Sequence, residues 1–392
     1  MKSIFYWSPC LTKVGTVKST INSAISLSKY SKNEFKVKII NSCGEWDEYQ
    51  NIFKKNNIDL INFRFNFFKY LPKNGFLQSR ISYLIIILFS FFPLVKLLKK
   101  EKPEFIIIHL ITSLPLLVNN LFKFNTKFIL RISGFPKLNF FRKILWKISS
   151  KNIFKITCPT KHLLSDLKEE KIFNNDKLFY LQDAIININD YRSNNINNLK
   201  FKNKINKFKK YFLSVGRLTR QKNYTYLISE FRKHLNNYTE DTLVIIGEGE
   251  DRVKLEELIK LNNLTDNIFL LGKIDNVYPY MKNARALILP SLWEEPGFVI
   301  VEAAFSNLFV ISSDCPNGPR EFLNEGKAGY LFENNKKNAL FGRLDSFKKE
   351  ENNLGSLKIR AKKNSSNYTL FRHHINLKEL LKNKDYNLYV GS

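Results

Sequence analysis

The sequence has little methionine and cysteine for its length, with two Met and four Cys among 392 residues. The cysteines lie far apart, at Cys10, Cys43, Cys158 and Cys315, and no two of them have the spacing of a metal or redox site. We therefore expect reduced thiols that pack as small apolar groups in a reducing cytoplasm. No internal repeat occurs at solenoid spacing, which excludes that class of fold.

The first residues lack the charged segment and the apolar core of a signal peptide. Residues 4–7, IFYW, instead predict a first β-strand, and Pro9 follows almost directly. We therefore expect no secretory leader at this end of the sequence.

Acidic residues are scarce beside basic ones, with 35 Asp and Glu against 63 Lys and Arg, a formal net charge of +28. Residues 1–180 contribute 30 − 11 = +19, and residues 181–392 contribute 33 − 24 = +9. Such a field attracts nucleic acid, anionic lipid or a phosphorylated substrate, although biased composition with a solvated lysine surface explains it equally well. The basic residues are mostly dispersed lysines without a nucleic-acid-binding motif, which argues against a nucleic-acid partner.

Short apolar segments typical of β-strands alternate with helical patterns along the whole sequence, which predicts a parallel α/β architecture. The predicted strands of the first half are residues 3–7, 35–41, 105–109 and 127–132, with a helix around residues 17–30. The predicted strands of the second half are residues 211–215, 242–246, 268–271, 286–289 and 309–312. Helices are predicted between them at residues 224–234, 252–261, 277–283, 298–306 and 319–323. Five strands with right-handed crossovers make a doubly wound sheet.

A change of composition divides the chain. Residues 190–210 are rich in Asn and Lys and contain no Gly or Pro, which indicates a linker. The predicted domains are thus residues 1–189 and residues 211–360. Residues 361–392 predict a helical tail that can pack back on the N-terminal domain.

Residues 81–98 form a nearly continuous apolar run that is interrupted by Pro93 and ends in lysines, including Lys96, Lys99 and Lys100. A membrane span needs about 20 apolar residues, so this run is slightly short. A buried core helix and a helix that touches a membrane both remain open.

The first informative motif is residues 214–223, SVGRLTRQKN, between a predicted strand and a predicted helix. Open α/β sheets bind ligands at this carboxyl end of a strand. Gly216 allows a sharp turn, and Arg217 and Lys222 place two cations that suit a diphosphate. The alternative is two surface cations on a loop.

The second motif, residues 246–252, IGEGEDR, superficially begins a dinucleotide-binding G-x-G-x-x-G fingerprint. Arg252 occupies the position of the third glycine, and three acidic residues would repel a pyrophosphate. We therefore reject an NAD-binding loop. Gly247 and Gly249 are interpreted as a tight turn whose backbone borders the ligand.

The third motif is residues 290–303, PSLWEEPGFVIVEA, in which a strand gives way to a helix. Glu294 lies in the loop and Glu302 in the helix, so the two carboxylates can bracket one elongated ligand. The free N–H groups between them suit a phosphate. The alternatives are a helix-dipole partner for Glu294 and a solvent-facing Glu302, but the apolar neighbours of Glu302 indicate burial, and a buried Glu needs partners.

The pattern Glu294-x7-Glu302, with Gly216-Arg217 and Lys222-Asn223 upstream, resembles the retaining family-4 glycosyltransferases of GT-B fold. Residues 312–321, SSDCPNGPRE, resemble members that extend lipid-linked glycans, O-antigens and capsules. The resemblance covers residues 211–335 and is weaker over residues 1–180. It implies two Rossmann-like doubly wound parallel-sheet domains that face each other across a cleft. Residues 1–189 would bind the acceptor, and residues 211–360 would bind a nucleotide-activated donor.

The resemblance implies a role for each matching residue of the second half. Arg217 and Lys222 would hold the donor diphosphate, Glu302 the ribose hydroxyls, and Glu294 the transferred sugar. The other donor contacts that it implies are Gly216, Gly247, Gly297 and Phe298.

In the first half the resemblance implies that His109 lies near the donor sugar and joins Glu294, Arg217 and Lys222 as a catalytic group. A lone His after a strand is more often structural. Acceptor contacts are implied for four residues: Gly15, Thr16, Arg131 and Ser133. The first loop, with Trp7-Ser8-Pro9 and residues 13–16, KVGT, departs from the family because it has only Gly15 where many members have two glycines.

The implied reaction transfers a hexose or N-acetylhexosamine from a nucleotide sugar to a lipid-linked glycan and retains the anomeric configuration. The resemblance to the family makes a UDP-sugar the expected donor. No Asp-x-Asp pair occurs, so we expect neither metal nor cofactor, and Arg217, Lys222 and a helix N-terminus would stabilise the leaving diphosphate. The leaving diphosphate would accept the proton of the acceptor hydroxyl, and domain closure would exclude water.

We expect a peripheral protein on the inner face of the plasma membrane. Another sugar-nucleotide reaction, a nucleic-acid-binding protein and a catalytically inactive subunit remain the alternatives.

Overall fold

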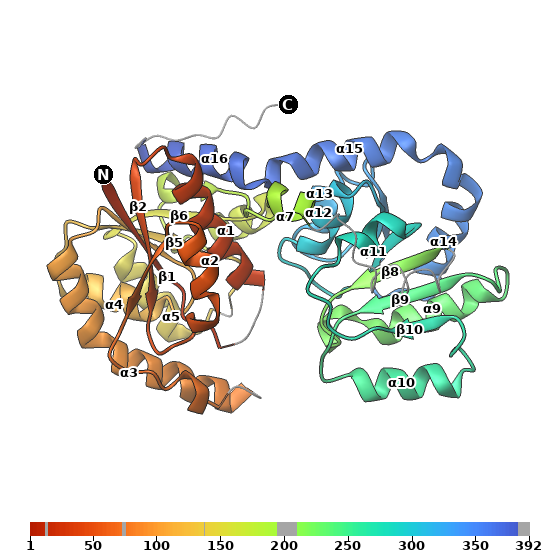
Figure 1. The fold of residues 1–392 in the computed structure, drawn as a ribbon, viewed down its shortest axis with the longest axis horizontal. Helices are drawn as coiled ribbons and strands as arrows, with labels where there is room; N and C mark the ends of the chain where they lie inside the picture. The colour runs from red at the N-terminus through yellow and green to blue at the C-terminus, as the bar shows by residue number, and fades with distance from the viewer. Residues whose placement is uncertain (12–14, 73–75, 137, 194–209, 383–392) are drawn as a thin grey trace. The chain divides into compact units, whose positions relative to one another are not determined.

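The structure is a computed structural model that describes residues 1–11, 15–72, 76–136, 138–193 and 210–382. The described chain forms two compact units. The first unit begins at Met1, ends at Ile185 and takes in the last described helix, α16 (Leu370–Lys382); the second unit is Ile186–Thr369. Each unit is a parallel sheet covered by helices (Figure 1), as the sequence predicts.

The sheet of the first unit has seven strands in the order β3-β2-β1-β4-β5-β6-β7, and every pairing is parallel. Its strands are β1 (Lys2–Trp7), β2 (Phe35–Asn41), β3 (Asp59–Asn62), β4 (Phe105–Ile108), β5 (Lys127–Arg131), β6 (Ile153–Cys158) and β7 (Leu178–Tyr180). All four residues of β4 are buried, because helices cover both faces of the sheet.

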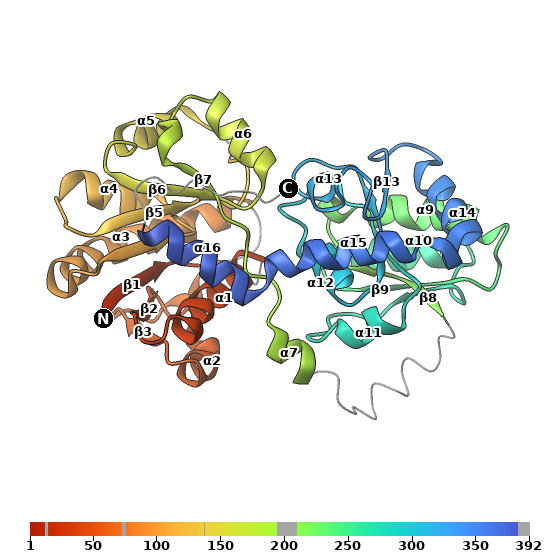
Figure 2. The same cartoon turned by 90° about the horizontal axis from the view of Figure 1, so that it is seen from above.

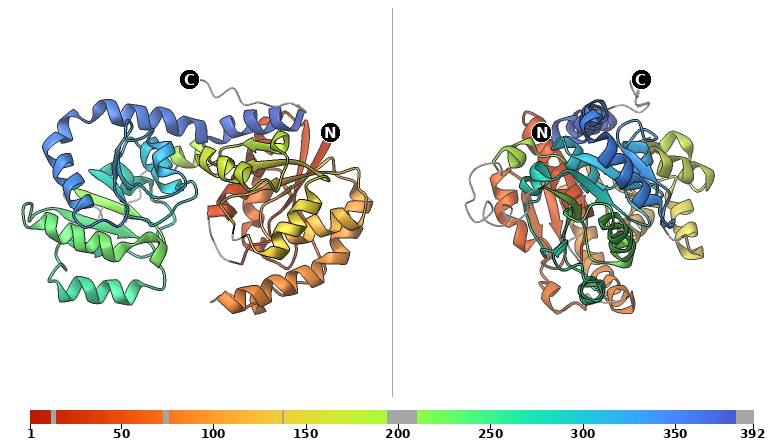
Figure 3. Two further views of the ribbon diagram at one scale, coloured as in Figure 1. Left: turned by 180° about the vertical axis from the view of Figure 1, so that it is seen from behind. Right: turned by 90° about the vertical axis from the view of Figure 1, so that its right-hand side faces the viewer.

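The helices of the first unit form two layers. One core lies between the sheet and α1, α2 and α16, and the other lies between the sheet and α3, α4, α5 and α6. The helices are α1 (Gly15–Tyr30), α2 (Gln50–Lys55), α3 (Phe76–Glu101), α4 (Ser113–Leu121), α5 (Phe140–Ser149) and α6 (Lys161–Glu169). Figure 3 shows α3, in orange, and α5, in yellow, on the same side of this unit.

The predicted C-terminal helical tail is divided between the units. Helix α15 (Gly355–Ser365) belongs to the second unit, whereas α16 packs beside α1 in the first (Figures 1 and 2). Lys155 Nζ donates to the carbonyl oxygen of Leu380 at 2.8 Å. His373 Nδ1 donates to the Gln182 carbonyl oxygen at 2.7 Å, and its Nε2 lies 2.9 Å from Ser23 Oγ. These buried polar contacts fix the position of α16.

The apolar run forms α3, a 26-residue helix that continues through Pro93. Its 18-residue apolar window has a mean hydropathy of 2.3, and one third of that window is buried. Ile86, Leu94 and Leu98 are buried in the unit, whereas Leu88 and Phe92 are 64% and 77% exposed. By length and composition α3 could cross a membrane, but one of its faces is part of the core of this unit.

The sheet of the second unit has six parallel strands in the order β10-β9-β8-β11-β12-β13. The strands are β8 (Tyr211–Val215), β9 (Thr242–Ile246), β10 (Ile268–Leu270), β11 (Ala286–Leu289), β12 (Phe309–Ser313) and β13 (Tyr330–Phe332). The helices are α7 (Ile188–Ser193), α9 (Tyr224–Leu235), α10 (Arg252–Leu261), α11 (Tyr278–Asn283), α12 (Phe298–Phe305), α13 (Pro319–Phe322), α14 (Ala339–Glu350) and α15. The five predicted strands are confirmed, and β13 is an additional one.

The sequence prediction missed four strands, β3, β6, β7 and β13. Three of them have only three or four residues and include partly exposed positions, whereas the equally short β4 and β11 are fully buried and apolar. The fourth, β6, contains Lys155, a residue seldom buried, which is only 2% exposed here. The predicted linker begins within α7, whose Tyr191 ring packs on Tyr278 and Phe305, and its residues 194–209 lie outside the described part of the chain.

Candidate functional site

Two motif loops meet at the carboxyl edge of the second sheet. Strands β8 and β11 are neighbours, and the connections from them run to opposite sides of the sheet, because β9 lies beyond β8 and β12 beyond β11. Ligands of open α/β sheets bind at such a reversal point. The β8–α9 loop carries residues 216–223, and the β11–α12 loop carries residues 290–297.

An ion pair joins these loops across 72 positions of sequence. Lys222 Nζ contacts Glu294 Oε1, and Ser291 Oγ donates to the same oxygen at 2.5 Å. The two charged side chains are 14% and 7% exposed. No hydrogen bond to Glu294 Oε2 comes from the residues that the structure describes, so the pair keeps bonding capacity for a ligand.

Glycines let the first two motifs pack on each other. A Cβ on Gly247, whose φ is +154°, would lie 1.8 Å from the Gly216 carbonyl oxygen, and one on Gly249 would lie 2.2 Å from that of Leu218. Gly216 itself lies under the Lys222 stem, since a Cβ there would be 3.1 Å from Lys222 Cε. The two glycines of the second motif therefore allow close contact between loops, a role that the sequence interpretation of a tight turn did not include.

Arg217 is exposed and makes no ion pair or side-chain hydrogen bond with any residue in the described ranges. It lies on the same loop as Lys222. Its guanidinium is available for a planar anionic group such as a phosphate.

Helix α12 begins after Gly297, which has φ +82°, and carries Phe298 and Glu302. Glu302 is 8% exposed, as its apolar neighbours predict. Tyr278 lies near it, since burial and then the charge of Glu302 raise the pKa of that phenol. The predicted donor residues thus lie on the β8–α9 and β11–α12 loops, on helix α12 and, for Gly247, on the β9–α10 loop that packs against Gly216.

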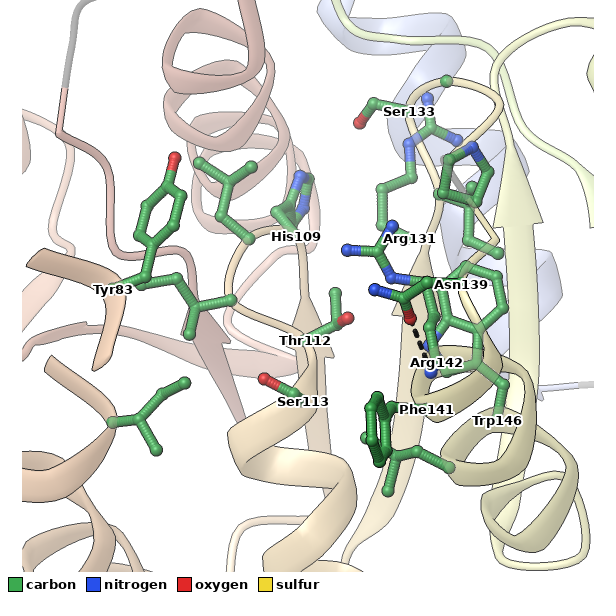
Figure 4. A pocket seen from close by; sticks show the side chains of 17 residues that line it. Tyr83, His109, Thr112, Ser113, Arg131, Ser133, Asn139, Phe141, Arg142 and Trp146 are labelled. Atoms are coloured by element: carbon green, nitrogen blue, oxygen red, sulfur yellow. Dashed lines mark hydrogen bonds between the residues drawn. The ribbon is translucent and has the colours of Figure 1, made fainter. Parts of the chain in front are cut away.

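The first unit has a cavity of about 540 Å³ at the carboxyl edge of β4 and β5, and it brings together His109, Arg131 and Ser133 (Figure 4). Burial, and then the charge of Arg131, lowers the pKa of His109 to about 3, so this imidazole is neutral near pH 7. His109 Nδ1 and Ser133 Oγ are buried and have no hydrogen-bond partner among the described residues.

Arg131 is held in place by an ion pair and a hydrogen bond within the first unit. Its guanidinium donates to Asp183 Oδ1 at 2.5 Å and to the Leu181 carbonyl oxygen at 2.7 Å, and Ser19 Oγ donates to the same Asp183 oxygen. Both charged side chains are 3% exposed. These contacts indicate that Arg131 stabilises the fold, and its predicted contact with an acceptor stays a prediction.

Gly15 and Thr16 form the start of α1 and do not line this cavity. The Thr16 carbonyl oxygen accepts a hydrogen bond from Thr20 within the helix. Lys13 and Val14 of the same predicted loop lie outside the described residues.

Sequence reasoning missed several polar residues at both edges. Ser291 was visible only as a hydroxyl three positions before Glu294. In the first unit the missed cavity residues are Thr112, Ser113, Asn139 and Arg142, which come from the β4–α4 connection and from the start of α5. No short motif joins them, so only the folded chain could identify them.

Residues 195–364 match the family described as "Glycosyl transferases group 1". The chain carries a glycosyl transferases group 1 domain. This domain covers nearly all of the second unit, including both loops of the Lys222–Glu294 pair. The resemblance stated from the motifs is therefore confirmed at the level of the family.

Two curated relatives extend this match. An uncharacterized glycosyltransferase of Methanocaldococcus jannaschii is 33% identical over 258 residues, 59% of this chain and 61% of that protein. The N-acetylgalactosamine-N,N'-diacetylbacillosaminyl-diphospho-undecaprenol 4-alpha-N-acetylgalactosaminyltransferase of Campylobacter jejuni is 33% identical over 153 residues, 39% of this chain and 41% of that protein. The matches thus span less than two thirds of either relative.

Solved structures share the fold along the whole chain. A glycosyltransferase from Rickettsia africae has a TM-score of 0.79 at 18% identity and covers 98% of this chain and 99% of its own. The Anabaena protein HepE in complex with UDP has a TM-score of 0.73 at 14% identity, with 97% and 99% covered. The group 1 domain and the first unit together thus have the GT-B fold.

Proposed function

We propose that this protein is a retaining glycosyltransferase that moves a hexose or N-acetylhexosamine from a UDP-sugar to a lipid-linked glycan. The observation that carries the proposal is the Lys222–Glu294 pair at the reversal point of the second sheet. It joins a cation to a carboxylate and leaves bonding capacity on both.

The chemistry of a nucleotide sugar explains why these two groups should touch. The bond that breaks joins the anomeric carbon of the sugar to the diphosphate, so a phosphate-binding group and a sugar-binding group must be neighbours. Lys222 can neutralise charge on the departing phosphate, while Glu294 accepts hydrogen bonds from sugar hydroxyls. Retention of configuration is part of the proposal because the motifs resemble retaining enzymes.

The other donor contacts follow from position. Arg217 lies on the same loop with a free guanidinium and can bind the diphosphate, and Glu302 can accept bonds from the ribose hydroxyls. The preference for UDP is supported by HepE, which was solved in complex with UDP.

A screen of nucleotide sugars tests this proposal. We expect UDP and one or more UDP-sugars to raise the melting temperature and slow donor hydrolysis to be detectable, because the donor site lies within one unit. Absence of any nucleotide-dependent shift, together with absence of hydrolysis, would contradict it.

We further propose that the diphosphate needs no metal ion, since Arg217 and Lys222 supply two positive charges on one loop. Transfer should then persist in excess EDTA. Loss of transfer in EDTA that added Mg²⁺ or Mn²⁺ restores would overturn this part alone.

A lipid-linked acceptor and a membrane surface are proposed for the first unit. The Campylobacter relative is named for a diphospho-undecaprenol substrate. Adjacent helices α3, α4 and α5 expose apolar side chains: Ile81, Leu84, Leu88, Phe89, Phe92, Leu117, Leu121, Phe140, Phe141, Ile144 and Ile148. Residues 76–151 contain 13 Lys and Arg but only two acidic residues.

We call this surface, made by the exposed residues of α3, α4 and α5, the apolar face. Basic residues beside an apolar surface suit anionic lipid, and each contributes about 1 kcal/mol near the headgroups. The four cysteines are buried free thiols, which is compatible with a reducing compartment. We therefore propose a peripheral protein on the cytoplasmic side of the membrane.

Liposome sedimentation tests the membrane proposal. We expect binding to anionic vesicles and hardly any to neutral ones, and salt should weaken it. A triple variant in which Gln replaces Lys96, Lys99 and Lys100 should bind less. A matched control replaces three exposed lysines of other helices, Lys54, Lys55 and Lys168, with Gln and should bind normally. A wild-type protein that stays in the supernatant with anionic vesicles at low salt would contradict the proposal.

A further inference from the structure

The cavity of the first unit opens between α3 and α5. Tyr83 and Ile87 line it from α3, Thr112 and Ser113 from the N-terminal end of α4, and Asn139 and Arg142 from the N-terminal end of α5. In Figure 4 Tyr83 lies on one side of the open space and Asn139 and Arg142 lie on the other. Together with the segment that follows β5 and carries Ser133, they shape one space of about 540 Å³.

The inner end of the cavity is polar and incompletely satisfied. His109 is 6% exposed, and its Nδ1 has no hydrogen-bond partner in the described chain, like the Oγ of Ser133. An unpaired buried polar atom is costly, and most such atoms in native proteins have a partner. A ligand with hydroxyl or phosphate oxygens would supply the missing partners.

The charge of the lining is positive. Two arginines line the cavity and no acidic residue does. Arg131 forms an ion pair with Asp183, and burial, followed by the nearby charge of Arg80, lowers the pKa of Arg142. An anion placed beside Arg142 would relieve this repulsion between two cations.

The outer end of the cavity meets the apolar face. Phe141 lines the cavity and is 80% exposed, and the adjacent Phe140 is 72% exposed. On the opposite side Tyr83 is 40% exposed, and the next residue of α3, Leu84, is 57% exposed. A ligand that enters here passes from a hydrogen-bonding interior, beside the exposed Arg142, to an exposed hydrocarbon surface.

From these observations we infer that the cavity binds the diphosphate end of an isoprenoid-diphosphate-linked acceptor, with its hydrocarbon chain on the apolar face. This inference deepens the proposed function and rests on it, because it assigns the acceptor of that reaction to a site. Arg142 binds the diphosphate, His109 and Ser133 hydrogen-bond to polar groups of the acceptor, and Phe141 contacts the first isoprene units. Membrane attachment and substrate entry then use the same side of the unit.

Isothermal titration with small probes tests the inference. The probes are farnesyl diphosphate below its micelle concentration, farnesol and inorganic pyrophosphate. We expect farnesyl diphosphate to bind at least tenfold more tightly than either part alone, because only it reaches both Arg142 and the apolar face. Equal affinity for farnesol would remove the role of the cations, and equal affinity for pyrophosphate would remove that of the hydrocarbon; either result overturns the inference.

Two variants locate the site. Arg142→Gln should weaken farnesyl diphosphate binding about tenfold, and Ser133→Ala, which removes a single hydroxyl, a few-fold. Lys168→Gln is the matched control, since Lys168 is an exposed residue of α6 that does not line the cavity, and it should bind like the wild type. Unchanged affinity in Arg142→Gln would overturn the assignment.

UDP binding in the same samples separates the two levels of the proposal. Normal UDP binding without selective farnesyl diphosphate binding would overturn the acceptor assignment and leave the proposed function standing. Absence of UDP binding in the wild type would instead remove the proposed function itself.

Discussion

Each unit has an ion pair at the carboxyl edge of its sheet, and the two pairs differ in how completely the protein encloses them. Arg131 and Asp183 are each 3% exposed, and Ser19 and the Leu181 carbonyl oxygen complete their hydrogen bonds. Lys222 and Glu294 are 14% and 7% exposed and have one hydroxyl, that of Ser291, beside them. The enclosed Arg131–Asp183 pair is typical of a structural contact, whereas the Lys222–Glu294 pair keeps hydrogen-bonding capacity for a ligand.

The largest effect that this comparison predicts is on the stability of the first unit. Removal of one partner leaves a buried charge unpaired, so Arg131→Met should lower the free energy of unfolding by about 3–5 kcal/mol. Chemical denaturation followed by circular dichroism measures it. The double variant Arg131→Met, Asp183→Leu should recover much of the loss, and no recovery would show that the pair does not act as a unit.

The corresponding change in the second unit should affect the reaction more than the fold. Lys222→Ala removes a group that stabilises the leaving phosphate, so turnover of a UDP-sugar should fall about a hundredfold or more. Lys254→Ala, at an exposed position of α10, is the control and should keep wild-type turnover. Full activity of Lys222→Ala would show that the second pair, too, is only structural.

The packing of the motif loops gives a smaller effect. Gly247→Ala adds a Cβ that would lie 1.8 Å from a carbonyl oxygen at a φ of +154°, so the loops must separate. We expect a loss of about 1–3 kcal/mol in stability and weaker UDP binding. Gly342→Ala is the control, since an added Cβ there meets nothing within 4 Å, and in the helix α14 it should stabilise by about 0.5–1 kcal/mol. Equal behaviour of the two variants would contradict this account.

The smallest effect at neutral pH is a pH dependence of the first unit, which grows as the pH falls. Burial lowers the pKa of His373 to about 4 and that of His109 to about 3, below the ordinary value of 6.5. The unfolded chain therefore binds protons that the folded one does not, and stability falls as pH drops from about 6.5 toward 4. Each group contributes about 1.4 kcal/mol per pH unit. Denaturation at pH 7 and pH 5 measures the slope, which His373→Gln should reduce and the exposed His162→Gln should not.

The sequence predicted more of the second unit than of the first, for a physical reason. Its five predicted strands lie in largely apolar runs, and its site residues come from contiguous loops whose glycines and prolines mark the turns. The pairing of Lys222 with Glu294 could not be predicted, because it depends on the adjacency of β8 and β11.

The first unit depends more on contacts that are distant in sequence. Strand β6 contains the buried Lys155, whose ammonium donates to the carbonyl oxygen of Leu380, 225 positions away, and lies over the Phe179 ring. The cavity is likewise assembled from α3, two loops and α5, so that His109 and Ser133 were recognised without Arg142. The exposed side of α3 was visible as hydropathy, but its division into a buried and an exposed face was not.

The affinity difference between UDP and UMP tests most directly the central claim, that the β8–α9 loop binds the donor diphosphate. Titration calorimetry should show UDP binding about tenfold or more tightly than UMP, since the second phosphate adds charge-assisted hydrogen bonds. Arg217→Gln should remove most of that difference while UMP affinity stays the same, and Arg220→Gln on the same loop should leave the difference intact. Equal affinity of the wild type for UDP and UMP, or an undiminished difference in Arg217→Gln, would contradict the account.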